Sequence, residues 1–259
     1  MRGIRTLFNN AAVAFSGGAD STCLLYLLNR FVSKADTVLG TKPTEVVALT
    51  VDHALQPMSK TFTQRCKELA DRIQVKHVTM KIPWGEPPYP PNPVSPDSVK
   101  QSAKGTKSGQ RPFEAIARSA RYHVLFDSLQ SLGISVLAMG HHADDQVETA
   151  LLRLAMGSSE VGAGGMRSCR RWGMGLGRAL GPGVLGWAGL AGMDMWITRP
   201  LLQFPKDRIL STCRANGLEY VDDPTNFQPD VTIRNSIRYK LDNMERSSLF
   251  DDSVSSVLS

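Results

Sequence analysis

Segments of strand pattern and helix pattern alternate along most of this 259-residue chain. Short apolar runs are each followed by a longer stretch with apolar residues spaced three and four apart. Parallel strands need helical crossovers of this kind, so the alternation predicts an α/β fold, a doubly wound parallel sheet with helices on both faces. Strands are expected at 11–15, 45–51, 76–82 and 135–139, and helices from 22, at 59–73, at 113–132 and from 144.

The six residues SGGADS, 16–21, join the first expected strand to the first expected helix. Gly17 and Gly18 permit a tight turn and the close approach of an anion, and Ser21 can cap the helix. The amides of the first helical turn and the positive end of the helix dipole then face whatever the loop encloses. This pattern predicts a phosphate-binding loop formed by Ser16, Gly17, Gly18, Ala19, Asp20 and Ser21.

Asp20 separates this loop from an ordinary turn, which two glycines alone would fit as well. A Walker A loop has a lysine after its last glycine, whereas no lysine lies between Phe15 and Asn29. A carboxylate beside a phosphate needs a bridging divalent cation, so Asp20 is a candidate Mg²⁺ ligand. The pattern resembles the pyrophosphatase loop of the N-type ATP pyrophosphatases, which cleave ATP between the α and β phosphates.

Composition narrows the class of protein further. The excess of 30 Lys and Arg over 24 Asp and Glu gives a net charge of +6, which favours a polyanionic partner without establishing RNA. The four cysteines form no CxxC pair, which argues against a structural zinc or an iron–sulfur cluster. The apolar stretch 172–196 is broken by glycines, Arg178, Pro182 and Asp194, so no membrane span is expected.

A second polar motif, GHHADDQVET at 140–149, follows the strand at 135–139. His141 precedes Asp144, Asp145 and Glu148, and helical spacing places these acids close together, with Val147, Leu151 and Leu154 on the apolar side. A single acid at a helix start would be explained by its favourable interaction with the positive end of the helix dipole. Three acids require a cation, and Mg²⁺ or a substrate ammonium fits carboxylates better than a histidine-bound metal.

Two further segments carry polar residues. In VDHALQ, 51–56, Asp52 and His53 either face a nucleotide or substrate or serve only the turn. Near the C-terminus, Arg234, Asn235 and Arg238 lie at the start of an expected helix, where they either hold RNA phosphates or form a solvated face.

Six motifs follow one another along the chain in this order: SGGADS, VDHALQ, EAIARSARYHVLF (114–126), GHHADDQVETALLRL, RPLL (199–202) and RNSIR. In that order the chain resembles the tRNA(Ile)-lysidine synthetases, with GHHADDQVET the most specific element. The resemblance implies ATP and Mg²⁺ as cofactors, and tRNA(Ile) and free L-lysine as partners. It also implies a reaction in which ATP activates the wobble cytidine of a CAU anticodon and lysine is then joined to it.

The resemblance also implies residue roles. Asp145 and Glu148 would bind the lysine amine, His141 would accept its proton, and Arg118 or Arg121 would contact the α phosphate. The loop residues and Asp52 would bind the nucleotide. Substrate contacts are expected from the polar side chains of Asp144, Arg199, Arg234, Asn235 and Arg238.

The chain departs from the family pattern at Ala54, Gln56 and Met156, where relatives commonly carry Gly, Arg and Arg. It is expected to form one catalytic domain, 1–245, with a flexible insertion at 85–110, a Gly- and Met-rich insertion at 167–192 and a disordered tail at 246–259. It ends soon after RNSIR, so the C-terminal domains that help larger relatives hold tRNA are expected to be absent.

Several alternatives stay open from the sequence alone. A tRNA thiolase or a small-molecule ligase of the same superfamily would share the loop, and a non-catalytic RNA-binding remnant would account for the departures. The sequence does not decide between a monomer and a homodimer, or between a mitochondrial and a cytoplasmic location.

Overall fold

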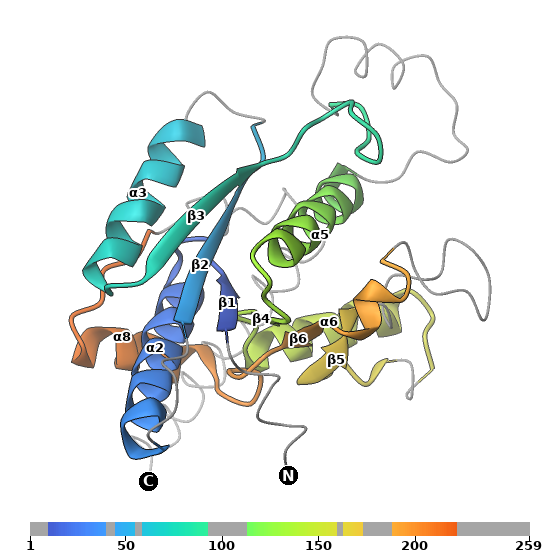
Figure 1. Ribbon diagram of the computed structural model, residues 1–259. Helices are drawn as coiled ribbons and strands as arrows, with labels where there is room; N and C mark the ends of the chain where they lie inside the picture. The colour runs from blue at the N-terminus through green and yellow to red at the C-terminus, as the bar shows by residue number, and fades with distance from the viewer. Residues whose placement is uncertain are drawn as a thin grey trace, which may run out of the picture.

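The computed structural model describes residues 10–39, 45–54, 59–92, 113–159, 163–172 and 188–221. Its strands are β1 (Asn10–Ala14), β2 (Glu45–Asp52), β3 (Lys76–Lys81), β4 (Val136–Ala138), β5 (Cys169–Arg171) and β6 (Trp196–Thr198). They form one sheet in the order β3-β2-β1-β4-β6-β5, shown in Figure 1. Every neighbouring pair is parallel except β5 and β6. The predicted doubly wound fold is confirmed, with one antiparallel strand at its edge.

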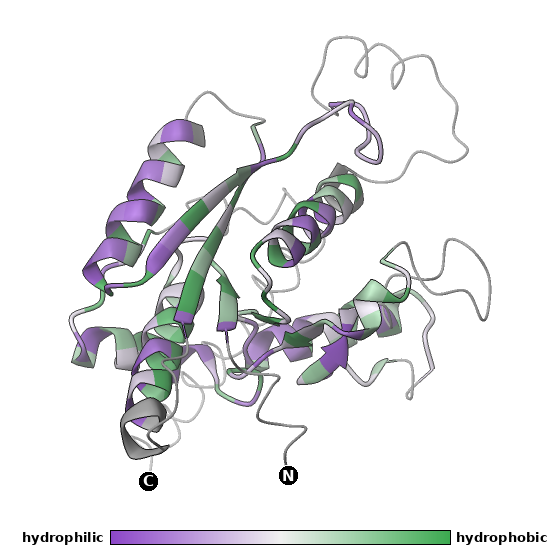
Figure 2. Ribbon diagram, viewed as in Figure 1, coloured by the Kyte–Doolittle hydropathy of each residue, from purple (hydrophilic) through white to green (hydrophobic). Residues whose placement is uncertain are grey.

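Helices cover both faces of this sheet. They are α2 (Ala19–Leu39), α3 (Ser59–Arg72), α5 (Phe113–Ser131), α6 (Ala143–Ala155) and α8 (Lys206–Ala215), with a short 3₁₀ helix at Ala191–Met193. Helices α2, α3 and α8 pack on one face and α5 on the other. In Figure 2, β2 is largely apolar while most of α3 is hydrophilic, as expected for a buried strand and an outer helix.

The strands divide their side chains between these two cores. Val13 of β1 contributes to the core under α2, whereas its neighbour Ala12 contributes to the core under α5. In β4, Ala138 likewise contributes to the core under α2, and Leu137 contributes to the core under α5. Adjacent residues of a strand point to opposite faces, so a strand buried on both sides is apolar at every position. This explains the continuous apolar runs in the sequence.

The connections of the sheet place a crevice between β1 and β4. From β1 the chain runs outward to β2 and β3, and then returns to β4 on the other side of β1. In open α/β sheets, ligands bind beyond the carboxyl ends of the strands at such a switch point. The loops that leave β1 and β4 are SGGADS and GHHADD, so the two most informative motifs meet at this edge.

Helix α6 differs from the pattern expected for it. Its expected apolar side is exposed, with Val147 at 48%, Leu151 at 37% and Leu154 at 48%. The side chain that α6 does bury is the acidic Glu148, at 1% exposure. The helix therefore buries an acidic side chain and leaves these three apolar side chains exposed.

The expected Gly- and Met-rich insertion at 167–192 is not irregular at its start. Cys169–Arg171 forms β5, and Trp172 is fully buried beside the rings of Tyr122 and Phe126, at centroid distances of 5.7 and 5.4 Å. A three-residue strand reading Cys-Arg-Arg is too short and too polar to show strand periodicity. Residues 173–187 lie outside the described residues.

Other predicted segments are described only in part. Of the insertion expected at 85–110, residues 85–89 form turns and bends, and Tyr89 donates a hydrogen bond to Asp127 of α5. Residues 93–110 of that insertion and the tail at 246–259 lie outside the described residues. None of the helices in the described ranges is long and apolar enough to cross a membrane.

Candidate active site

The loop after β1 is closed by its own hydrogen bonds. The Ser21 hydroxyl donates to the Gly18 carbonyl at 3.1 Å and accepts from the Ser16 amide at 3.3 Å. Thr22 donates from its hydroxyl to the Gly17 carbonyl at 3.3 Å. Helix α2 begins at Ala19, so Ser21 lies in the first turn, and its expected position as the cap residue is wrong. Its hydroxyl instead ties the turn to the loop.

Gly17 is the position of this loop that requires glycine. Its φ of +71° lies in the left-handed region, which residues with a Cβ rarely adopt. An added Cβ would also lie 3.0 Å from Cys66 Sγ and 3.6 Å from Val221 Cγ2. The Gly17 carbonyl accepts a hydrogen bond from the Val221 amide at 2.8 Å. The loop is thus fixed from behind, with its open side toward the crevice.

Gly140 brings the loop after β4 against the start of α2. A Cβ at this position would lie 3.1 Å from the carbonyl carbon of Asp20 and 3.1 Å from the amide nitrogen of Ser21. Only glycine permits so close an approach of two backbones. The two loops therefore form one continuous surface.

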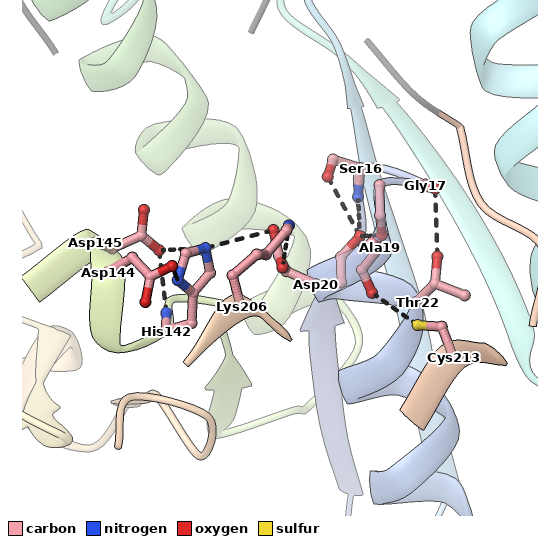
Figure 3. A network of polar contacts seen from close by, with 12 residues as sticks. Ser16, Gly17, Ala19, Asp20, Thr22, His142, Asp144, Asp145, Lys206 and Cys213 are labelled. Atoms are coloured by element: carbon pink, nitrogen blue, oxygen red, sulfur yellow. Dashed lines mark hydrogen bonds and ion pairs between the residues drawn. The ribbon is translucent and has the colours of Figure 1, made fainter. Parts of the chain in front are cut away.

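His142 links the acids of the two loops, as Figure 3 shows. Its Nε2 lies 3.8 Å from Asp20 Oδ2 and 3.6 Å from Asp145 Oδ2. Its Nδ1 lies 4.0 Å from Asp144 Oδ2. The backbone amide of His142 donates to the Asp145 carboxylate at 3.0 Å, which fixes the start of α6. One buried imidazole thus connects the predicted phosphate loop with the predicted acidic cluster.

Lys206, the first residue of α8, completes this network. Its Nζ lies 2.5 Å from Asp20 Oδ1, although the two residues are 186 positions apart in sequence. The side chains of Lys206 and Asp20 are 36% and 29% exposed. The carboxylate of the loop therefore faces a cation from a distant helix.

The three acids of α6 differ in burial. The side chain of Asp144 is 48% exposed, that of Asp145 is 13% exposed, and the residue Glu148 is 1% exposed. Burying a carboxylate is costly unless a positive group or hydrogen bonds compensate it. Asp145 and Glu148 therefore mark the interior end of the cluster, and Asp144 lies toward solvent.

Arg199 holds His141 on the other side of the same loop. The buried Arg199 donates from Nε to His141 Nδ1 at 3.2 Å and from a terminal nitrogen to the Arg167 carbonyl at 2.7 Å. A nitrogen that accepts this hydrogen bond has its lone pair occupied, so a neutral His141 carries its proton on Nε2. This contact weakens the predicted role of His141 as proton acceptor.

A group of arginines surrounds the buried Tyr122 of α5. Burial alone would raise the pKa of the Tyr122 phenol, but nearby positive charges outweigh it and lower the pKa below its usual value. These charges belong to Arg118, Arg121, Arg199 and Arg170. The guanidinium carbons of Arg118 and Arg121 lie 5.6 and 6.0 Å from the centre of the ring. The arrangement creates a strongly positive environment beside the crevice.

The crevice contains a pocket of about 260 Å³. Its lining includes the loop residues Ser16, Asp20 and Ser21, together with Arg121 and His141. This volume is just below the range of about 300–1,000 Å³ that is usual for small-molecule sites. The pocket therefore joins the phosphate loop, an arginine and the first two residues of the loop after β4, Gly140 and His141, in a single cavity, whereas Asp144, Asp145 and Glu148 are not part of its lining.

The turn after β2 contributes His53 to the pocket lining, but not Asp52. Asp52 instead accepts a hydrogen bond from the Ala54 amide at 2.7 Å, which is turn chemistry. Ala54 has a φ of +51°, a conformation that favours glycine. Ala54, one of the expected departures from the family pattern, therefore lies at a position whose backbone suits glycine. Burial, with a contribution from Arg121, lowers the pKa of His53.

Comparison of this sequence with known proteins points to the same kind of nucleotide-binding loop as the geometry does. The PP-loop domain family matches residues 6–245 of the chain. The chain belongs to the PP-loop domain family. It is 31% identical over 223 residues to the tRNA(Ile)-lysidine synthase of Bradyrhizobium sp., which covers 85% of this chain and 48% of that protein. It is 32% identical over 229 residues to that of Alkalilimnicola ehrlichii, which covers 88% and 40%. The chain thus spans about half the length of these relatives or less.

Structure comparison supports the same fold. The U34-tRNA thiolase NcsA from Methanococcus maripaludis superposes with a TM-score of 0.60 at 16% identity, covering 95% of this chain and 72% of that one. At this identity the likeness concerns the fold alone. The predicted resemblance to tRNA(Ile)-lysidine synthetases is confirmed as a similarity of sequence.

The PP-loop fits a magnesium ion that arrives with a nucleotide. Within the described residues, no group of three or more His, Cys, Asp or Glu side chains is placed to hold a metal. Mg²⁺ commonly uses one or two carboxylates and takes its remaining ligands from substrate phosphates and water. Asp20, which lines the pocket, suits such a site.

Sequence reasoning missed three residues of this region. The pair His141–His142 beside three acids was a signal for His142, although only His141 was assigned a role. No local pattern pointed to Lys206 or Arg170, because their neighbours in the site come from other parts of the chain. The predicted substrate residues Arg234, Asn235 and Arg238, and the departure at Gln56, lie outside the described residues.

Proposed function

We propose that this PP-loop protein ligates lysine to the wobble cytidine of tRNA(Ile) with a CAU anticodon, using ATP and releasing AMP and pyrophosphate. The observation that carries the proposal is His142, which lies between Asp20 of the phosphate loop and Asp145 of α6. It links a nucleotide-type loop with a buried acidic cluster suited to an ammonium group. Similarity to tRNA(Ile)-lysidine synthases supports this assignment.

The first step would transfer an adenylyl group to the base. The β and γ phosphates of ATP lie against the amides of the loop, and cytidine O2 attacks the α phosphate to give an adenylated base and pyrophosphate. Mg²⁺ held by Asp20 would neutralise phosphate charge during this attack. Arg121 lines the pocket, so it is better placed than Arg118 to contact the α phosphate.

The second step would join lysine to C2 of the base and release AMP. A free lysine ε-amine has a pKa of about 10.4, so only about one molecule in 10³ to 10⁴ is neutral at pH 7. The site must therefore bind the ammonium and then remove a proton. Asp145 and Glu148 supply the carboxylates for the first task, and the more exposed Asp144 lies at the entrance. A carboxylate of this pair is a better proton acceptor than His141, because Arg199 occupies His141 Nδ1.

The tRNA would approach over the arginines beside the pocket. Arg118, Arg121, Arg170 and Arg199 concentrate positive charge around Tyr122. Phosphate contacts of this kind position a nucleic acid, whereas contacts to the base edges select it. Arg234, Asn235 and Arg238 are assigned to the same substrate from the sequence.

Pyrophosphate release tests the proposal. Wild-type protein with ATP, lysine and a CAU-anticodon transcript should release pyrophosphate, and a transcript with uridine at the wobble position should not support release. Asp20→Asn should lower the rate at least about 100-fold, because a metal contact is worth several kcal/mol in the transition state. Asp207→Asn, an exposed acid of α8, is the matched control and should retain the rate.

Other outcomes would identify the alternatives. Intact ATP binding with no release on any tRNA would support a non-catalytic RNA-binding protein. Release that depends on a sulfur donor and not on lysine would support a thiolase.

A further inference from the structure

The PP-loop lacks a lysine in its own sequence, yet a lysine lies on it in the fold. Lys206 Nζ is 2.5 Å from Asp20 Oδ1, and Figure 3 shows its side chain reaching from α8 toward the start of α2. In a Walker A loop the phosphate-binding lysine follows the last glycine directly. Here the only acid of the loop faces an ammonium from the far end of the described chain.

Packing holds Lys206 in this position. Ile209 and Cys213 follow it on α8 at spacings of three and seven and are buried against α2, with Cys213 Sγ 3.7 Å from the Ala19 carbonyl. On the other side, the Ala143 amide of α6 donates to the Phe204 carbonyl at 3.0 Å. The segment that carries Lys206 is thus fixed to the starts of both α2 and α6.

The charge arrangement suits a ligand better than a purely structural pair. Partly exposed ion pairs contribute little to folding, and both of these side chains are about one third exposed. Without nucleotide, the ammonium cancels the Asp20 charge that would repel a polyphosphate. A metal ion on Asp20 would displace that ammonium, and the nearest new anion would be the phosphate held by the same loop. A lysine side chain has the flexible stem that such an exchange needs.

We propose that Lys206 is the phosphate-binding lysine of this loop, and that it exchanges the Asp20 carboxylate for the β or γ phosphate of Mg²⁺-bound ATP. The proposal rests on the proposed function for its nucleotide, but it requires neither tRNA nor lysine. It gives α8 a direct part in nucleotide binding.

Equilibrium binding of Mg²⁺–ATP, Mg²⁺–pyrophosphate and AMP to the full chain tests it. Lys206→Met should weaken ATP and pyrophosphate about ten-fold or more, because a charge-assisted hydrogen bond is lost. AMP, which has no β or γ phosphate, should change less than about two-fold. Arg208→Met removes the same charge from an exposed position of α8 and should leave all three affinities unchanged.

A second measurement separates this role from a structural one. In nucleotide-free protein, Lys206→Met should bind Mn²⁺ more tightly than wild type, because the competing ammonium is gone from Asp20. A structural role predicts no such gain and predicts equal losses for ATP and AMP, and either result overturns the proposal. Lys206→Gln replaces the methionine variant if that variant does not fold. Wild-type protein that binds Mg²⁺–ATP but releases no pyrophosphate with tRNA overturns the tRNA reaction alone.

Discussion

The two loops at the carboxyl edge of the sheet are built in opposite ways. The PP-loop after β1 is closed mainly by hydrogen bonds among Ser16, Gly17, Gly18, Ser21 and Thr22. The loop after β4 takes its partners from elsewhere in the chain. The turn of the first loop is therefore closed by bonds among neighbouring residues and supported from behind by Val221, whereas the second loop depends more on partners from distant segments.

The partners of the second loop come from three separate segments. His142 faces Asp20 of α2, His141 accepts a hydrogen bond from Arg199, and the Ala143 amide donates to the Phe204 carbonyl. Substitutions at the glycines of the first loop should therefore act through the backbone, and substitutions at the acids of the second through charge.

After Asp20→Asn, the next largest effect is expected inside the acidic cluster. Asp145→Asn keeps an oxygen that can accept the His142 amide but removes the charge proposed to bind lysine. The KM for lysine should rise about 10- to 100-fold, since a hydrogen bond to a charged group contributes about 1.5–3 kcal/mol. Steady-state pyrophosphate release at varied lysine concentration measures this.

Asp144→Asn is the matched control one residue away. Because the Asp144 side chain is 48% exposed, its KM for lysine should change less than about three-fold. Equal effects at the two positions would show that the helix start recognises lysine only by its overall charge.

A smaller effect is expected at the backbone of the first loop. Gly17→Ala places a Cβ at a φ of +71° and 3.0 Å from Cys66 Sγ. Gly133→Ala shares the left-handed backbone, with a φ of +65°, but has no atom within 4 Å of the added Cβ. Urea unfolding should show that Gly17→Ala costs about 1–3 kcal/mol more than Gly133→Ala, the usual cost of overpacking.

This comparison isolates the contact behind the loop from the strain of the turn itself. Equal losses of stability would mean that Cys66 moves aside freely. The rigid back wall described for the PP-loop would then be incorrect.

The smallest effect is expected from the histidine that supports the first loop. Thr50 donates its hydroxyl proton to the Phe15 carbonyl, so His77 Nε2 donates to Thr50 Oγ1, at 2.8 Å. Burial lowers the pKa of His77 from 6.5. Below pH 6.5 the unfolded chain therefore binds a proton that the folded chain does not, and stability falls with decreasing pH until the lower folded pKa is passed.

Unfolding by urea at pH 7.5 and pH 5.5 measures this dependence. His77→Gln should reduce the loss of stability between the two pH values, while His53 and His123, whose pKa values burial also lowers, maintain part of it. If His77→Gln left the difference in unfolding free energy between the two pH values unchanged, a buried neutral His77 in contact with Thr50 would be contradicted.

The contrast between the loops also explains what the sequence could predict. The strands from β1 to β4, helices α2, α3, α5 and α6, and the PP-loop were predicted closely, because apolar periodicity and glycine placement are local signals. Strand β5 was missed because its three residues carry no periodic pattern. The exposed side of α6 was misjudged because apolar spacing does not report which side faces the protein.

Residue roles followed the same division. The residues of SGGADS could be assigned as a group, whereas Lys206 and Arg170 enter the site through packing between distant segments. Asp52 and Ala54 show the intermediate case, in which a motif marked the turn correctly but did not tell which of its side chains lines the pocket.

At Gly140 the backbones of the two loops touch without a side chain between them, since an added Cβ would lie 3.1 Å from both Asp20 and Ser21. A displacement at the start of α6 therefore passes directly to the start of α2, with no soft layer to absorb it. Such a junction would couple the binding free energies of two ligands bound on its opposite sides. By thermodynamic reciprocity, each ligand must alter the affinity of the other by the same factor. Cooperation between two ligands would then need no moving lid, because the direct backbone contact at Gly140 would carry it.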